Sequence, residues 1–242
     1  MKIIETKLCN FHNITLDSAL DSVEKFSQSS GLDIVVTPNV DHMARLATDN
    51  ESPLHDIYKN SSLCICDSRI LQKLLSLKGK TVSEVIPGST LTQILFDSKL
   101  TSEDNIVIIG GSEEVLLKLK AKYKHLSISH HNPPMGFINR ENEVQKAIDF
   151  CIEMNPDFIF LAVGSPRQEV LAEKIKKTHK CSAVALCIGA SILFLVDEEK
   201  RAPLWMQKAN LEWLFRMLQD PRRLMMRYWG NFLRLHRIFK KI

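Results

Sequence analysis

Residues 157–169 read DFIFLAVGSPRQE, an apolar run followed by a glycine turn and a polar stretch. A short apolar run is typical of a strand buried on both faces of a parallel sheet. The turn after it leads into a helix whose first turn carries Arg167, Gln168 and Glu169. Because this order of strand, turn and helix recurs through the first 195 residues, we predict an α/β, Rossmann-like parallel sheet with helices on both faces.

Other segments with this pattern lie on both sides of the quoted stretch. The expected strands are Asp33–Thr37, Leu63–Cys66, Asn105–Ile109, Asp157–Val163 and Ala183–Ile188. The first expected helix begins at Pro38. The others are Ser68–Leu77, Ser112–Tyr123, Pro166–Lys177 and Ala190–Leu195. Ligands of such sheets bind outside the carboxyl ends of the strands, so the residues that follow each strand are the first candidates for chemistry.

Residues 196–242 differ in composition, and we predict a catalytic domain at 1–195 and a basic helical appendage at 196–242. From residue 200 onward the chain has 11 Lys and Arg against two acidic residues, a net charge of +9, whereas residues 1–199 carry −5. All three tryptophans also lie there. A basic, aromatic segment favours an anionic and partly apolar partner, for which a membrane surface is suited.

Two helices are expected in the appendage, one from Pro203 to about Gln219 and one after Pro221. On the second, an apolar stripe faces away from a basic one, as in helices that lie at a membrane interface. The stripe consists of Leu224, Tyr228, Phe232, Leu235 and Phe239, and the basic face of Arg223, Arg227, Arg234, Arg237 and Lys241. The apolar stripe also suits packing against the catalytic domain, and the appendage could instead contact a neighbouring subunit of a homo-oligomer.

The whole composition is that of a folded globular protein: 242 residues, 45% hydrophobic and 25% charged. The six cysteines form no C-x-x-C pair, which favours a reducing compartment. The first residues lack the pattern of a signal peptide, and no apolar run is long enough to span a bilayer. We therefore expect a cytoplasmic protein.

Polar residues follow several of the expected strands. Thr37, Asn39 and Asp41 could bind sugar hydroxyls or cap the next helix. Asp67 could act as a general base or, equally, as the N-cap of the Ser68–Leu77 helix. Gly110 could let the backbone approach a ligand, or simply form a tight turn.

Other chemistry has weaker support in the sequence. Gln168 and Glu169 could hold a nucleotide or sugar, although an acidic residue in a first turn also favours the helix dipole. His130 and His131 are adjacent on a strand and would face opposite sides, so we expect no metal site. The cysteines are expected to pack, and no G-x-S-x-G elbow is present.

Several blocks of the chain together resemble the WecG/TagA/CpsF family of bacterial glycosyltransferases, glycosyltransferase family 26. The blocks are TPNVDH (37–42), CDS (66–68), IIGG (108–111), HHNPPMGF (130–137), NPDFIFLAVGSPRQE (155–169), KRAPLWMQ (200–207) and LEWLFRMLQDPRR (211–223). The resemblance covers nearly the whole chain, and its closing blocks with GSPRQE are the most specific.

The resemblance implies an inverting, metal-independent glycosyltransferase without a cofactor. It would move N-acetylmannosamine, its uronic acid or a hexose from a UDP-sugar to an undecaprenyl-diphosphate-linked saccharide in surface polysaccharide or teichoic acid linkage synthesis. Asp67 would be the catalytic base, and the enzyme would sit on the inner face of the cytoplasmic membrane. Donor or diphosphate contacts would come from Thr37, Asn39, Gly110, Gly136, Gln168, Arg216, Arg222 and Arg223.

The chain departs from the family pattern at three positions. Ser68 replaces a usual Gly, and Thr90 and Leu193 stand where the family usually has Asp. These changes motivate one alternative, an inactive paralogue. Another is a nucleotide-binding protein on the same fold, although the glycine fingerprint of a dinucleotide-dependent oxidoreductase is missing. A basic tail would also suit nucleic acid, but its apolar stripe suits lipid or protein better, so we expect no nucleic-acid partner.

Overall fold

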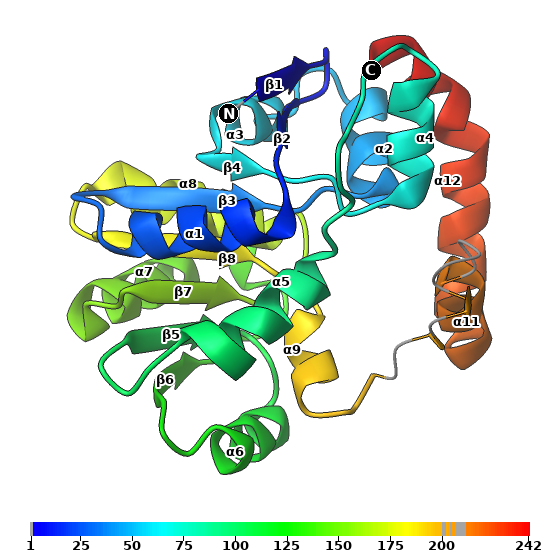
Figure 1. Ribbon diagram of the computed structural model, residues 1–242. Helices are drawn as coiled ribbons and strands as arrows, with labels where there is room; N and C mark the ends of the chain where they lie inside the picture. The colour runs from blue at the N-terminus through cyan, green and yellow to red at the C-terminus, as the bar shows by residue number, and fades with distance from the viewer. Residues whose placement is uncertain (1, 200–201, 204, 207–211) are drawn as a thin grey trace.

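The computed structural model describes residues 2–199, 202–203, 205–206 and 212–242. Its centre is a six-stranded sheet in the order β4-β3-β8-β7-β5-β6, and all of its strand pairs are parallel (Figure 1). The strands are β3 (Leu32–Val36), β4 (Leu63–Cys64), β5 (Asn105–Ile109), β6 (Ser127–His131), β7 (Phe158–Leu161) and β8 (Ala183–Cys187). The predicted α/β, Rossmann-like fold is confirmed.

Helices cover both faces of the sheet, because successive strand residues point to opposite sides. Ile34 and Val36 belong to one apolar cluster, and Val35 between them belongs to the other. The first cluster includes residues of α2 (Val40–Thr48), α3 (Leu54–Asn60), α4 (Arg69–Ser76), α7 (Glu141–Met154), α8 (Arg167–Thr178) and α12 (Pro221–Lys241). The second includes residues of α1 (Leu16–Ser27), α5 (Gly88–Ile94), the π-helix η1 (Leu95–Lys99), α6 (Glu113–Lys122) and α9 (Ser191–Leu195).

The remaining elements are a small hairpin, a short 3-10 helix and a further helix. The hairpin pairs β1 (Lys2–Glu5) with β2 (Asn10–Asn13) in antiparallel register. His12 of β2 joins it to the edge of the main sheet, since its Nδ1 accepts a hydrogen bond from the Cys64 amide at 2.9 Å. The 3-10 helix η2 spans Phe137–Asn139, and α11 spans Glu212–Gln219.

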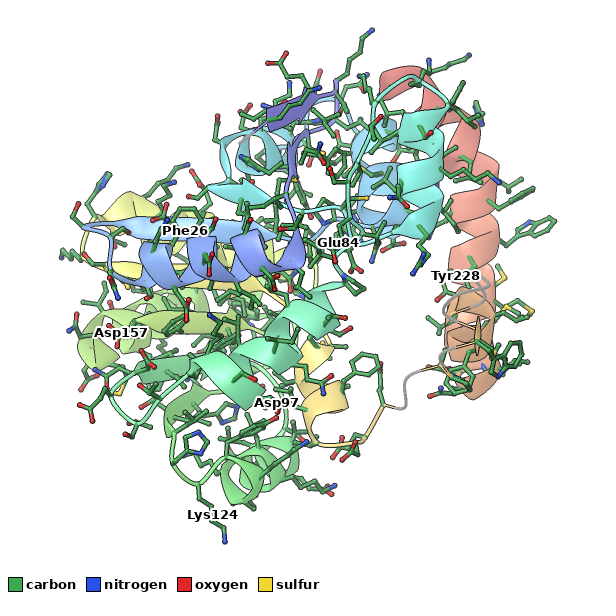
Figure 2. The ribbon with its side chains drawn as sticks, in the orientation of Figure 1. Phe26, Glu84, Asp97, Lys124, Asp157 and Tyr228 are labelled. Atoms are coloured by element: carbon green, nitrogen blue, oxygen red, sulfur yellow. The ribbon has the colours of Figure 1, made fainter. Side chains whose placement is uncertain are left out.

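The connection between α4 and α5 is held in place by polar contacts. Glu84 accepts a hydrogen bond from the Leu16 amide at 2.8 Å, at the start of α1 (Figure 2), and the Ile86 amide donates to the Cys66 carbonyl at 3.0 Å. The segment then brings Gly88 against Thr37. A Cβ atom at Gly88 would lie 2.6 Å from Thr37 Oγ1, so a glycine is needed for α5 to begin this close to the end of β3.

The final helix, α12, runs alongside α2 (Figure 1). Leu224, Ile238 and Ile242 are buried, and Leu235 and Phe239 pack against the core. Two residues of the expected apolar stripe, Leu235 and Phe239, therefore face the catalytic domain, the second of the two alternatives for it, whereas Phe232 is exposed. The predicted boundary between residues 195 and 196 stays a prediction, but α12 contributes to the main core.

A second apolar surface lies on the other side of α12, and we call it the outer patch. At 100° per residue its members fall within about 120° of arc, away from the buried residues. They are Met225, Met226, Trp229, Phe232 and Leu233, and each is between 57% and 71% exposed. No helix within the described residues is both long enough and apolar enough to cross a bilayer.

Candidate active site

The candidate residues lie at one edge of the sheet, because all six strands are parallel and share a carboxyl end. Asp67 and the Thr37–Asn39 turn follow the neighbouring strands β4 and β3, and the Asp67 amide donates to the Pro38 carbonyl at 3.2 Å. Gln168 follows β7, and its side chain reaches the turn after β8. The structure thus brings Thr37, Asn39, Asp67 and Gln168 to three adjoining turns.

Asp67 does not cap the helix that follows it. Ser68 is the N-cap of α4, and its hydroxyl accepts a hydrogen bond from the Leu71 amide at 3.3 Å. The capping interpretation of Asp67 is therefore wrong. Burial, with Asp67 nearby as a smaller cause, raises the pKa of the adjacent Cys66 thiol to about 12, which leaves this cysteine protonated at neutral pH.

Asn39 does cap a helix, as one of its two interpretations predicted. Its Oδ1 accepts a hydrogen bond from the Asp41 amide at 3.0 Å, and the Asn39 amide donates to His42 Nδ1 at 3.1 Å. This capping box fixes the turn between β3 and α2. The Asn39 side-chain nitrogen is not used by the cap, so the residue can cap α2 and still offer a donor to a ligand.

Gln168 is 3% exposed and already takes part in two hydrogen bonds. Its Oε1 accepts from the Gly189 amide at 2.9 Å, and its Nε2 donates to Glu169 Oε1 at 3.1 Å. The Tyr58 hydroxyl donates to the same Glu169 oxygen at 2.8 Å. Burial, reinforced by Glu169, raises the pKa of Tyr58 well above its usual value, so the hydroxyl remains a donor. Gln168 is thus a buried connector that retains one further N–H for a ligand.

Gly110 and Gly136 have positive φ angles of 96° and 74°, which explains why glycine stands at both positions. A Cβ atom at Gly110 would lie 2.8 Å from a Val163 side-chain carbon, so close packing on the end of β7 accounts for this turn. The loop that contains Gly136 returns toward α8, where Met135 Sδ lies 3.9 Å from Arg167 Nη1. Contact of either glycine with the sugar donor stays a prediction.

Three predicted diphosphate ligands lie on the last two helices. Arg216 belongs to α11, and Arg222 and Arg223 to the first turn of α12. Their side chains lie outside the described residues. The expectation that they bind diphosphate therefore stays a prediction.

The adjacent histidines of β6 occupy different environments, as their alternation on a strand predicts. His130 Nε2 lies 3.1 Å from the Gly110 carbonyl, whereas the His131 ring packs 5.4 Å from the Phe150 ring, centre to centre. Burial, with His130 as a smaller cause, lowers the pKa of His131. Among the residues that the structure describes, no three His, Cys, Asp or Glu side chains are grouped to hold a metal ion.

Three residues that connect the turns were not predicted from the sequence. Tyr58 lies in α3, where the sequence has no motif that could have pointed to it. His42 and Arg45 lie on α2, and Arg45 Nη1 donates to Ser165 Oγ at 2.8 Å, from the β3 side of the site to the β7 turn. His42 belongs to the TPNVDH block, which was the one available indication.

Comparison with known proteins gives a match along almost the whole chain. The sequence model of the Glycosyl transferase WecG/TagA/CpsF family matches residues 2–242. A protein of Staphylococcus aureus strain MW2, named N-acetylglucosaminyldiphosphoundecaprenol N-acetyl-beta-D-mannosaminyltransferase, is 26% identical over 222 residues, which cover 89% of this chain and 84% of that protein. Proteins of the same name from strains COL and MRSA252 have the same identity and coverage.

Proposed function

Because the chain belongs to the WecG/TagA/CpsF family and is a glycosyltransferase, we propose that it transfers N-acetylmannosamine from its UDP derivative to undecaprenyl-diphosphate-linked N-acetylglucosamine. The names of the Staphylococcus aureus relatives support the transferred sugar and the acceptor. The uronic acid of N-acetylmannosamine and a hexose are the other donor sugars to be compared. The product would enter surface polysaccharide or teichoic acid linkage synthesis.

The position of Asp67 carries the proposed mechanism. Its carboxyl group is half-buried beside the Thr37–Asn39 turn, and the capping of α4 is left to Ser68. A sugar hydroxyl is a weak nucleophile and needs a base as it attacks. Asp67 takes the proton while the acceptor oxygen bonds to C1 of the donor sugar. The bond from C1 to UDP breaks with its electron pair leaving on UDP, and this single displacement inverts C1.

The departing UDP gains negative charge, which must be stabilised. We assign this task to Arg216, Arg222 and Arg223, whose guanidinium groups match diphosphate oxygens and would make a divalent metal ion unnecessary. Binding of the donor is assigned to the turns at the sheet edge, through Thr37, Asn39, Gly110, Gly136 and Gln168. Asn39 and Gln168 each retain an amide N–H for this purpose.

A lipid-linked acceptor places the enzyme at a membrane, and we assign the contact to the outer patch of α12. Its apolar side chains are flanked by exposed Arg234, Arg237 and Lys240, the combination that binds anionic bilayers. Trp229 and Phe232 stack with their ring centres 6.0 Å apart, which forms a continuous apolar surface. The enzyme would bind peripherally, on the inner face of the cytoplasmic membrane.

The test is sugar transfer to a short prenyl-diphosphate-linked N-acetylglucosamine, with a panel of UDP-sugars, with and without EDTA, and with anionic vesicles. We expect transfer from UDP-N-acetylmannosamine at the same rate in both conditions. Transfer that EDTA abolishes would reject metal independence. Absence of transfer from every donor by the folded protein would favour the inactive paralogue or the nucleotide-binding protein, and UDP binding would distinguish these two.

The three departures from the family pattern leave this chemistry in place. Ser68 supplies the N-cap of α4, a stabilising role that a glycine there performs less well. Thr90 lies in the first turn of α5, and Leu193 packs partly buried against the second apolar cluster. Neither position removes Asp67, and both are candidates for setting the choice of donor sugar.

A further inference from the structure

One carboxyl oxygen joins side chains from three helices behind the candidate site. Glu169, in the first turn of α8, is 1% exposed. Its Oε1 accepts hydrogen bonds from Tyr58 of α3 and from Gln168, and His42 Nε2 of α2 lies 3.9 Å away. Glu169 is therefore the common neighbour of residues that control separate turns.

Two of these residues lead directly to the sheet edge. Gln168 holds the turn after β8 through the Gly189 amide, at 2.9 Å. His42 holds the turn after β3, since its Nδ1 lies 3.1 Å from the Asn39 amide nitrogen and 2.9 Å from Asn39 Oδ1. A change at Glu169 is thus transmitted to Asn39 on one side and to Gly189 on the other.

The two contacts of His42 Nδ1 require different protonation states of the ring. If Nδ1 is unprotonated, it accepts from the Asn39 amide, and Nε2 carries the proton. If only Nδ1 is protonated, it donates to Asn39 Oδ1, releases the Asn39 amide and turns an Nε2 lone pair toward Glu169. A carboxyl group opposes that lone pair, so Glu169 selects the forms of His42 that carry a proton on Nε2.

The second oxygen of Glu169 argues against a purely stabilising role. Oε2 is buried and has no hydrogen-bond partner among the described residues. A buried acceptor without a partner destabilises the folded protein. A glutamine here would keep an oxygen for Tyr58 and Gln168 without burying a carboxyl group, so stability alone does not explain the glutamate.

We propose that Glu169 is a positioning residue for the donor-sugar pocket, which sets the protonated nitrogen of His42 and the amide orientation of Gln168 and so fixes Asn39 and the Gly189 turn. This inference rests on the proposed function, because Asn39 and Gln168 are donor ligands only there. Glu169 itself lies behind the pocket and does not touch the donor sugar. It acts on the sugar only by positioning Asn39 and Gln168.

The first test needs no substrate. Nitrogen-15 NMR of the histidine rings in the full chain reports which nitrogen is protonated, and Glu169→Gln changes only the carboxyl group. The His42 signal is identified by its loss in His42→Gln. We expect Nε2 protonated in the wild type, and a larger share of the form protonated on Nδ1 alone in Glu169→Gln, because the amide oxygen left opposite Nε2 is a weaker acceptor than a carboxyl group. Predominance of that form in the wild type, or an unchanged ring in the variant, would overturn the proposal.

The second test separates donor binding from the rest of the reaction. Glu169→Gln should raise the KM for the UDP-sugar about tenfold, a loss of about 1.4 kcal/mol. The KM for the acceptor and the melting temperature should stay near wild type. Asp97→Asn is the control, because Asp97 also accepts from a tyrosine hydroxyl, that of Tyr123 at 2.6 Å, but is exposed, and Tyr123 belongs to the other apolar cluster.

His42→Gln distinguishes positioning from capping. Glutamine at this third helical position can still accept from the Asn39 amide, so the capping box survives. We expect the same rise in donor KM as in Glu169→Gln. A donor KM equal to that of the wild type in either variant, or equal rises in both KM values with a lower melting temperature, would overturn the proposal. Failure of the wild type to use any donor would reject the proposed function, while the ring measurement would still decide the role of Glu169.

Discussion

The turns at the sheet edge and the outer patch of α12 differ in how their side chains are satisfied. Behind the turns, Tyr58 and Gln168 are buried and both donate a hydrogen bond to the buried Glu169, so the protein itself determines their geometry. On the outer patch, Trp229 and Phe232 stack together but are more than 60% exposed to water. The first region is organised before a ligand arrives, whereas the second gains stability only when another apolar surface covers it.

Helix α12 links the two regions, because it carries the outer patch and packs against α2 at the sheet edge. The first turn of α2 carries Asn39 as its cap and His42 in its capping box, and the buried face of α12 packs against α2. Asn231 of α12 is 6% exposed and donates to Asp41 Oδ1 at 3.1 Å. The contrast is thus between an inner side of α12 that packs against the helix leading from the site and an outer side that we propose as the membrane contact.

The largest expected effect is at the sheet edge. Asp67→Asn removes the proposed base and should lower kcat by about 10²–10⁴-fold, the usual contribution of general base catalysis. UDP affinity and melting temperature should stay near wild type, because Ser68 and not Asp67 caps α4. The control is Asp56→Asn, an exposed residue of α3. An active Asp67→Asn enzyme would exclude this residue as the base.

Substitutions on the inner side of α12 should lower the free energy of unfolding. Ile238 is completely buried, and Ile238→Ala should lower the free energy of unfolding by about 2–5 kcal/mol, measured by denaturant titration. Vesicle binding of the folded variant should not change. A loss below about 0.5 kcal/mol would mean that the appendage is an independent unit. The same packing makes deletion of residues 200–242 a poor test of catalysis, since it would also open the core.

Substitutions on the outer patch should weaken vesicle binding and leave the free energy of unfolding nearly unchanged. Trp229→Ser and Phe232→Ser should each weaken co-sedimentation with anionic vesicles by about tenfold, because each removes an apolar side chain from the contact. Unfolding free energy should change by less than about 0.5 kcal/mol. Leu117→Ser is the control, because Leu117 is 69% exposed on α6. Unchanged vesicle binding in both patch variants would remove the outer patch as the membrane contact.

The smallest expected effect is at His12, which accepts a hydrogen bond from the Cys64 amide of β4, the strand that leads to Asp67. Burial lowers the pKa of His12 below its ordinary 6.5, so the folded protein favours the neutral ring. In the unfolded chain His12 binds its proton at a higher pH than in the folded protein. The free energy of unfolding therefore falls as the pH drops through about 6.5 toward the pKa of His12 in the folded protein. The wild type should lose more melting temperature between pH 8 and pH 5 than His12→Gln does. Equal losses would show that His12 titrates alike in both states.

The sequence predicted the sheet well because its strands are continuous apolar runs. Asn105–Ile109 matches β5 in full, and Leu63–Cys66 is longer than β4 by two residues. Strand β6 was expected only at His130 and His131 and was not among the apolar strands, because Ser127–His131 is mostly polar at the sheet edge. Asp67 was found from its place after a strand, but its role beside Ser68 could not be decided, since both residue types cap helices.

Long-range contacts explain the remaining differences. Tyr58 and Glu169 meet over more than a hundred residues of sequence, and no local pattern encodes that bond. For α12, periodicity identified a helix with an apolar stripe, but it could not reveal that the helix packs against α2. Nor did the stripe include Met225, Met226, Trp229 and Leu233, which form the outer patch with Phe232.

The pairing of α2 with α12 also has a consequence for synthesis. About 170 residues separate the two helices, which corresponds to about 10–35 s at about 5–20 residues per second on the ribosome. During that time the side of α2 that packs against α12 has no partner from that helix. The nascent protein therefore exposes an apolar surface until α12 has been synthesised, and its folding yield should depend on chaperones that bind such surfaces.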